Sequence, residues 1–295
     1  MALKDAYTLG PIEINGSVLF PVTSSSLDHG DQKLSFNTDG EVDQAFIGLM
    51  KQSPRFKAST PKIDVIDTIG LDGLALSAAG LEQWFLKIDQ DAHRVGGSSD
   101  QSRTIANGLA VLRTITASEG PVNASAEIEI IARSNDGTTS PHVIGTGDAP
   151  NALDNADVWT LGACSVNGTT IEEVTNVVFD TGMTEFVITS SGRTFPTLVA
   201  INQRAPTMTI TSLDLTLAAT MTEQALALNG TNGAVMSFKK MVRDSIVSAT
   251  VRNITMLNGM ATASVVEAVD GSNATLQITI EARKGTAAMW TTADV

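Results

Sequence analysis

Two stretches of the sequence decide how the chain is organised: YTLGPIEING at residues 7–16 and WTLGACSVNG at residues 159–168. Each begins with an aromatic residue followed by Thr-Leu-Gly, and each ends in Asn-Gly after a short apolar alternation. The two stretches lie 152 positions apart. A repeat at a fixed offset indicates that one structural unit occurs twice in the chain, and this bears on every motif that follows.

The offset persists well beyond these two phrases. When residues 7–65 are laid over residues 159–217 without a gap, eleven positions are identical, whereas unrelated stretches of this length share roughly three or four. Five of the eleven are glycine or proline, which fix backbone turns. The identical residues of the first stretch are Thr8, Leu9, Gly10, Asn15, Gly16, Val22, Thr23, Asp28, Gly30, Gly40 and Pro54.

Small shifts in the offset extend the match almost to the end of the chain. The sequence therefore predicts two tandem copies of one domain. The expected boundaries are 1–137 for the first copy, 138–157 for a loop-rich linker and 158–295 for the second copy.

Alternation with a period of two dominates both halves, for example in TMTITSLDLTLAAT at 207–220 and ATLQITIEAR at 274–283. Asn-Gly and Asp-Gly, the preferred dipeptides of tight hairpins, recur between such segments. We therefore expect a mainly β fold, in which each copy is an antiparallel β-sandwich or barrel.

One flanking α-helix per copy is also expected. In GLEQWFLKIDQD, residues 80–91, the apolar residues Leu81, Trp84, Phe85 and Ile88 recur at helical spacing. The matching segment AVMSFKKMVRDSIV, residues 234–247, has the same spacing. Residues 41–51 are compatible with either a short helix or a strand.

The composition limits the possible partners. Asp and Glu outnumber Lys and Arg by 32 to 19, which gives a net charge of −13. Such a chain should repel both nucleic acid and anionic membranes. Only 17% of the residues are charged, which indicates surface that is covered by other subunits. No signal peptide or apolar run of about 20 residues is present, so we expect synthesis in a cytosol.

The search for catalytic or metal-binding residues gives no strong candidate. DHGD at residues 28–31 resembles a metal-binding cluster, but its match at 180–183 is DTGM, which keeps only Asp and Gly and thus indicates a turn. His29, His93 and His142 lack ligand spacing, and the single cysteine, Cys164, matches an isoleucine in the first copy. We expect no catalytic, cofactor-binding or metal site, no cofactor and no enzymatic activity.

The duplicated acidic β domain, with the paired phrases and the two expected helices, resembles the tail-tube proteins of long-tailed bacteriophages, in particular those whose chain carries two tube domains. The resemblance covers nearly the whole chain, although the family has no diagnostic motif. It implies trimeric rings of two-domain chains that mimic hexamers and stack into a tube through which DNA passes without specific binding. Other tail proteins (terminator, baseplate and tape measure) would contact the tube, and the protein would be a virion component.

Three alternatives remain open at this stage. A capsid decoration protein or a receptor-binding β module could also carry a tandem repeat, a baseplate hub shares the related fold, and a hydrolase could use the cluster around Asp28. Contacts between stacked rings are expected in loops at about 41–60 and 193–212, where Lys51, Arg55 and Lys57 match the uncharged residues Gln203, Thr207 and Thr209.

Overall fold

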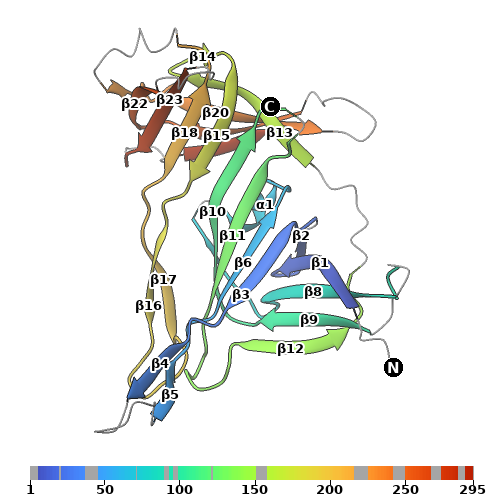
Figure 1. Cartoon of the computed structure of the whole chain (residues 1–295). Helices are drawn as coiled ribbons and strands as arrows, with labels where there is room; N and C mark the ends of the chain where they lie inside the picture. Colours follow the sequence, from blue (N-terminus) through green and yellow to red (C-terminus); the bar gives the residue numbers. More distant parts are fainter. Residues whose placement is uncertain are drawn as a thin grey trace.

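The chain folds almost entirely into antiparallel β-strands (Figure 1), as a computed structural model shows. The mainly β, antiparallel fold expected from the alternation is therefore confirmed. The residues that the structure describes are 6–19, 21–36, 46–70, 72–89, 93–95, 99–120, 122–150, 158–215, 225–241, 250–266, 274–284 and 290–294.

Two five-stranded sheets, one from each half of the chain, have the same strand order. The first has the order β12-β9-β8-β1-β2 and the second β24-β21-β20-β13-β14. The strands of the first sheet are β1 (Ala6–Ile14), β2 (Ser17–Leu19), β8 (Leu81–Ile88), β9 (Asp100–Ile105) and β12 (His142–Gly147). Those of the second are β13 (Val158–Val166), β14 (Thr169–Ile171), β20 (Ala234–Met241), β21 (Val251–Met256) and β24 (Trp290–Asp294).

A ten-stranded sheet runs through both halves, in the order β19-β22-β23-β18-β15-β10-β11-β6-β3, with β7 paired to β10 (Figure 1). The first half supplies β3 (Ser24–Asp28), β6 (Arg55–Thr60), β7 (Leu74–Ala75), β10 (Gly108–Ser118) and β11 (Ser125–Ala132). The second half supplies β15 (Val174–Asp180), β18 (Thr207–Ser212), β19 (Leu226–Ala227), β22 (Gly259–Val266) and β23 (Thr275–Ala282).

Each half also carries a two-stranded hairpin whose described strands pair only with each other and not with these sheets. We call β4 (Gln32–Phe36) with β5 (Phe46–Lys51) the first arm, and β16 (Thr184–Ile188) with β17 (Leu198–Gln203) the second arm. In Figure 1 the second arm runs along the molecule toward the first arm. The expectation that residues 41–60 and 193–212 are loops is wrong for the segments that form β5, β6, β17 and β18.

The two predicted helices are wrong where the structure describes them. Residues 81–88 form β8 between β1 and β9, and residues 234–241 form β20 between β13 and β21. The reason is that β8 is covered on both faces: Trp84 is buried, while its neighbour Phe85 points to the opposite face, beneath the guanidinium of Arg103 at 4.8 Å. Apolar residues on both faces of a strand reproduce the spacing of a helical stripe. Residues 90–91 and 242–247 lie outside the described residues.

A different segment forms a helix. In the described part of the chain the α-helical segment is α1 (Val65–Ile69), and residues 217–221, which match it in the second half, lie outside the described residues. The predicted linker also differs, because residues 142–147 form β12, which pairs with β9 at the edge of the first sheet. Residues 151–157 of that linker lie outside the described residues.

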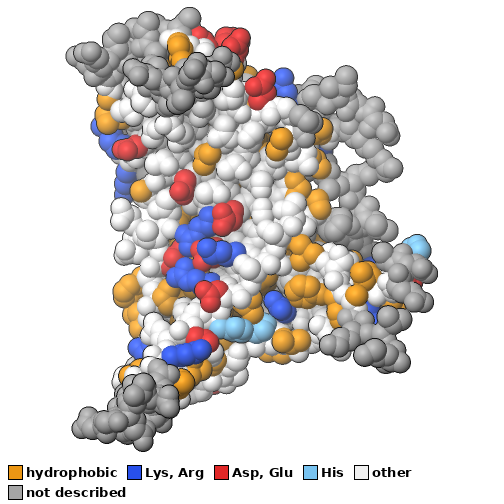
Figure 2. Space-filling model, in the orientation of Figure 1, with side chains coloured by type: hydrophobic (Ala, Val, Ile, Leu, Met, Phe, Trp, Pro, Cys, Tyr) orange, Lys and Arg blue, Asp and Glu red, His pale blue; other side chains and the backbone are white. Residues whose placement is uncertain are grey.

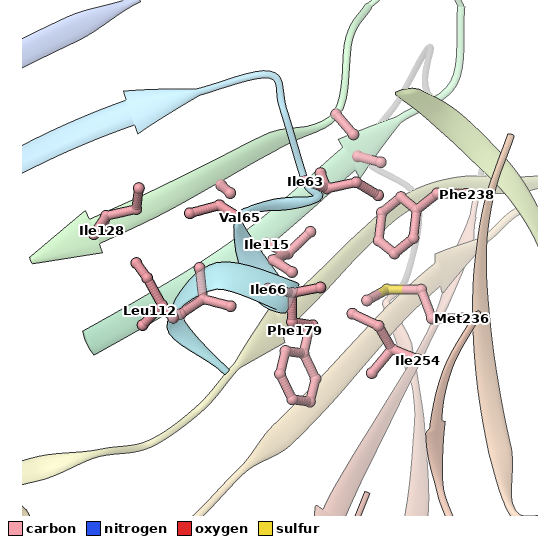
Figure 3. Close-up of a cluster of buried hydrophobic side chains, with 14 of the residues drawn as sticks. Ile63, Val65, Ile66, Leu112, Ile115, Ile128, Phe179, Met236, Phe238 and Ile254 are labelled. Atoms are coloured by element: carbon pink, nitrogen blue, oxygen red, sulfur yellow. The ribbon is translucent and has the colours of Figure 1, made fainter. Parts of the chain in front are cut away.

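The buried core is shared by the two halves (Figure 3). Val65 and Ile66 of α1 belong to the same buried cluster as Ile115 of β10 and the second-half residues Met236 and Phe238 (Figure 3). One hydrophobic cluster thus joins α1, the ten-stranded sheet and the sheet around β20. An isolated first half would leave this side of α1 exposed to water, so burial of apolar area couples the two halves.

Arg252 of β21 adds a polar contact at the same place. Its Nη1 lies 2.8 Å from an oxygen of Asp64 and 2.9 Å from one of Asp67, at the start of α1. Its guanidinium also lies over the ring of Trp159, 5.4 Å from the centroid. The second half therefore holds the helix of the first half by charge as well as by apolar packing.

The two repeated phrases, at residues 7–16 and 159–168, have the same local turn structure. Asn15 and Asn167 have positive φ angles of 50° and 51°, which suits Asn in a tight turn. The side-chain amide of Asn15 donates to the carbonyl of Ala75, and that of Asn167 to the carbonyl of Ala227, 152 residues further on. The bulge after Leu9 in β1 recurs after Leu161 in β13.

Candidate assembly interface

The two halves meet where β10 pairs with β15 inside the ten-stranded sheet. Thr114 to Ser118 of β10 lie opposite Asp180 to Asn176 of β15. The hydroxyl of Thr181 extends this junction by donating to the carbonyl of Leu112 at 2.7 Å. This junction is an antiparallel pairing between a strand of the first half and a strand of the second half.

The second arm covers one face of that sheet. Val199 and Ile201 of β17 pack against a small cluster that includes Val111 of β10, Ile131 of β11 and Met183. Val111 and Ile131 are fully buried although they point away from the main core. The arm therefore excludes water from a part of the sheet that would otherwise be exposed.

Four charged residues gather where the arm meets the sheet, and we call them the Arg–Glu cluster: Arg55, Arg113, Glu129 and Glu185. Figure 2 shows charged side chains of both signs gathered on this face. Arg113 Nε donates to Glu129 Oε2 at 2.6 Å, and Arg55 Nη1 to Glu129 Oε1 at 3.0 Å. Glu185, from the arm, forms ion pairs with Arg113 and Arg55.

Burial and charge act in opposite directions on the pKa of Glu129. Burial alone raises the pKa of this carboxyl, because the charged form loses its hydration. The hydrogen bonds and charges of Arg113 and Arg55 outweigh burial and hold the pKa below its ordinary value. Glu129 is therefore ionised at neutral pH and links β11 to β6 and β10, while Glu185 joins the same two arginines to the arm.

The matching strands at the other ends of the chain lack such partners among the described residues. β3, at one end of the ten-stranded sheet, pairs with β6 alone. Residues 264–266 of β22 pair with β23 on one side, while β19 covers only positions 260 and 261 on the other. Among the described strands, β3 and β22 thus leave two sheet edges open, and their place in the strand order matches the two edges that meet at β10 and β15.

The first arm exposes apolar side chains on both of its strands. Its apolar side chains Leu34, Ile47, Leu49 and Met50 are 46%, 64%, 50% and 55% exposed. On the sheet, Met260 of β22 is 45% exposed. Large exposed apolar side chains on a hairpin, next to unpaired sheet edges, are typical of a surface that another protein covers.

The DHGD segment, the candidate metal cluster of the sequence, connects β3 to β4, and its two aspartates accept hydrogen bonds there. Asp28 accepts a hydrogen bond from the N–H of Gly30 at 2.9 Å, and Asp31 accepts one from Gln52 at 2.8 Å. In the described part of the chain, no group of three or more His, Cys, Asp or Glu side chains could hold a metal ion.

The three histidines and the cysteine are the remaining candidate residues from the sequence. The structure brings His29 and His142 together, with ring centroids 5.8 Å apart, a contact that their sequence spacing did not reveal. His93 lies 3.9 Å from Asp89 on the surface. Cys164 is buried, and burial raises the pKa of its thiol to about 11.

Sequence reasoning also missed three members of the Arg–Glu cluster. Arg113 and Glu129 interrupt the otherwise apolar segments VLRTI and EIEII, and this interruption was the available signal. Glu185 carries no comparable signal, because its role depends on the path of the arm. Arg55 was singled out for contacts between rings, but here it lies in an ion pair within the chain.

A scan of protein-family models finds no match to this chain, and a search of curated proteins finds none. Among the described residues, no helix has the length and apolar character needed to cross a membrane.

Proposed function

We propose that this chain is the structural subunit of a bacteriophage tail tube and that it consists of two tandem copies of one β domain. The shared strand order of the two five-stranded sheets supports the duplication. So do the matching turn hydrogen bonds of Asn15 and Asn167. The proposed role is mechanical and involves neither catalysis nor a cofactor.

One observation carries the proposal: the β10–β15 junction is a template for a contact between chains. β15 of the second copy matches β3 of the first, and β10 of the first copy matches β22 of the second. If the internal junction is repeated, the open edge of β22 pairs with the open edge of β3 in the next chain. Such a head-to-tail contact is heterologous and generates a ring when the rotation closes.

The register of the repeated junction follows from the strand pairs. Gly108 and Gly259 both lie opposite an alanine that ends the partner strand, Ala132 and Ala282. With the bulge in β10 taken into account, the segment from Thr114 matches the segment from Ser264. Ser264 should therefore face Asp28 of the neighbouring chain, and residues 265 and 266 should face positions 27 and 26.

Three chains would bring six copies into one ring, as the resemblance to two-domain tube proteins implies. In such a ring the ten-stranded sheets form one continuous wall without open edges. The face of this wall opposite the core is rich in hydroxyl groups, for example Thr116, Ser125, Thr209 and Thr279. We propose that the part of this polar face that the arms leave uncovered, which also carries the oppositely charged Lys57 and Glu127, lines the channel and lets DNA slide without being held.

Proline substitutions on β3 test the ring. Backbone N–H groups of an edge strand point alternately toward β6 and outward, so one of Ser25→Pro and Ser26→Pro removes an outward donor and spares the pairing with β6. We expect that variant to keep the far-ultraviolet circular dichroism spectrum and thermal transition of the wild type but to remain a single chain by light scattering. Wild-type protein should form rings or tubes visible by negative-stain microscopy.

Two results would contradict the proposal. Wild-type protein that stays monomeric at all concentrations would exclude a self-assembling tube subunit. Rings formed equally well by both folded proline variants would exclude the β3 edge as the contact.

A further inference from the structure

The exposed apolar side chains of the first arm match side chains of the second arm that are packed against the sheet. Ile47 and Leu49 of β5 match Val199 and Ile201 of β17 at the offset of 152. The two arms also have the same register, since Leu49 lies opposite Lys33 and Ile201 lies opposite Glu185. Val199 and Ile201 are packed against the first-copy sheet, whereas Ile47 and Leu49 are exposed.

The surface that would receive the first arm can be located from the same strand pairs. The second arm lies on Val111 of β10 and Ile131 of β11. The matching residues in the second copy are Thr262 of β22 and Glu281 of β23. Both are exposed, and the neighbouring Met260 is 45% exposed.

The charges of the two contacts are opposite in sign. Within the chain, the acidic Glu185 of the second arm meets the basic Arg55 and Arg113 of the sheet. On the first arm the matching residue is the basic Lys33. On the second-copy sheet Thr207 matches Arg55, and Thr207 lies directly opposite Glu281 in the strand register.

We propose that the first arm of one chain docks on strands β22 and β23 of a second copy of the chain, with Leu49 against Thr262 and Lys33 facing Glu281. This contact rests on the proposed ring, because the arm follows β3 directly in the chain and reaches that face only if β3 pairs with β22. The occupant of the exposed arm is thus another copy of this protein.

The charge reversal also determines which sheet surface each arm can bind. A second arm placed on β22 and β23 would bring Glu185 toward Glu281 and would remove it from Arg55 and Arg113. A first arm placed on β10 and β11 would bring Lys33 toward those same arginines. Like charges brought together at an interface exclude wrong partners, so each arm fits only its own sheet.

A charge-exchange experiment tests this contact. We expect Lys33→Glu and Glu281→Lys each to raise the protein concentration needed for ring assembly by about tenfold. The double variant Lys33→Glu/Glu281→Lys should return to within about threefold of the wild type. Lys239→Glu, at an exposed position on β20 of the other sheet, is the matched control and should assemble normally. Assembly is measured by light scattering and negative-stain microscopy on the full-length chain.

A cross-linking measurement tests the geometry separately. Leu49→Cys chains are mixed with Thr262→Cys chains and treated with a short bismaleimide, to which the buried Cys164 is shielded. The proposal predicts cross-linked pairs in the mixture and none in either protein alone. Rings that form in the wild type and are lost in the proline variant, but that ignore both charge substitutions and give no cross-link, would overturn the arm contact and leave the tube intact. Single substitutions that impair assembly without rescue by the double variant would overturn the pairing of Lys33 with Glu281. A wild type that never assembles would overturn both proposals.

Discussion

Substitution of Glu129 by glutamine should destabilise the chain by an amount that depends on pH. The variant keeps the size of the side chain but removes the charge that Arg113 and Arg55 share. Charge-assisted hydrogen bonds contribute about 1.5–3 kcal/mol each, and loss of one partner from a buried ion pair costs ~3–5 kcal/mol. Glu185 remains as a counter-charge and the Arg55 side chain is 33% exposed, so the lower part of these ranges applies.

We therefore expect Glu129→Gln to lower the free energy of unfolding by about 2 kcal/mol at neutral pH, and the melting temperature by roughly 5 °C. Because the folded-state pKa of Glu129 is below its ordinary value, its contribution is fully present above the unfolded pKa and is lost as the pH falls through the folded pKa. The difference between wild type and variant should stay constant from about pH 7 to pH 5.5 and shrink below about pH 4.

The assay is thermal and urea unfolding of the unassembled chain, followed by circular dichroism across this pH range. Glu127→Gln is the control, since Glu127 lies on the same strand and shows no ion pair among the described residues. The control should change stability by less than about 0.5 kcal/mol. A Glu129→Gln variant as stable as the wild type at pH 7, or equally destabilised at every pH, would refute this reasoning.

Three further predictions concern a turn, the thiol and the channel face. Gly182→Ala should lower the free energy of unfolding by ~2 kcal/mol or more, because φ is 57° and an added Cβ would lie 2.1 Å from the carbonyl oxygen of Ala205. The control Gly192→Ala, at a position with φ 74° and open space around the added Cβ, should cost only about 1 kcal/mol when both variants are measured by urea titration. Burial raises the pKa of the Cys164 thiol to about 11, so Cys164 should resist iodoacetamide at pH 8 in the native chain and react after unfolding. Mass spectrometry measures the alkylation, and rapid alkylation of the native chain would contradict the burial of Cys164. Thr209→Lys with Thr211→Lys should leave tubes intact by electron microscopy and slow DNA delivery by phage particles, whereas unchanged delivery would argue against this face lining the channel.

The sequence predicted the β class and the positions of tight turns, because turn glycines and Asn-Gly pairs fix local backbone geometry that depends little on the rest of the fold. Asn15 and Asn167, chosen from the sequence, do have the same φ angle and the same hydrogen-bond pattern. Local signals of this kind can be recognised in a single sequence.

The helices were mispredicted because periodicity does not reveal how many faces of a segment are covered. Trp84 and Phe85 satisfy a helical stripe, and they also satisfy a strand that is packed on both sides. The Arg–Glu cluster was missed for a related reason, since Glu185 meets Arg113 only because the second arm crosses the sheet at β10 and β11.

A cryo-electron-microscopy reconstruction of the assembled protein tests the central claim most directly. The account predicts rings of three chains in which β22 of each chain is hydrogen-bonded to β3 of the next, with Ser264 opposite Asp28. Rings of six chains, or rings in which both of these edges remain open, would contradict it.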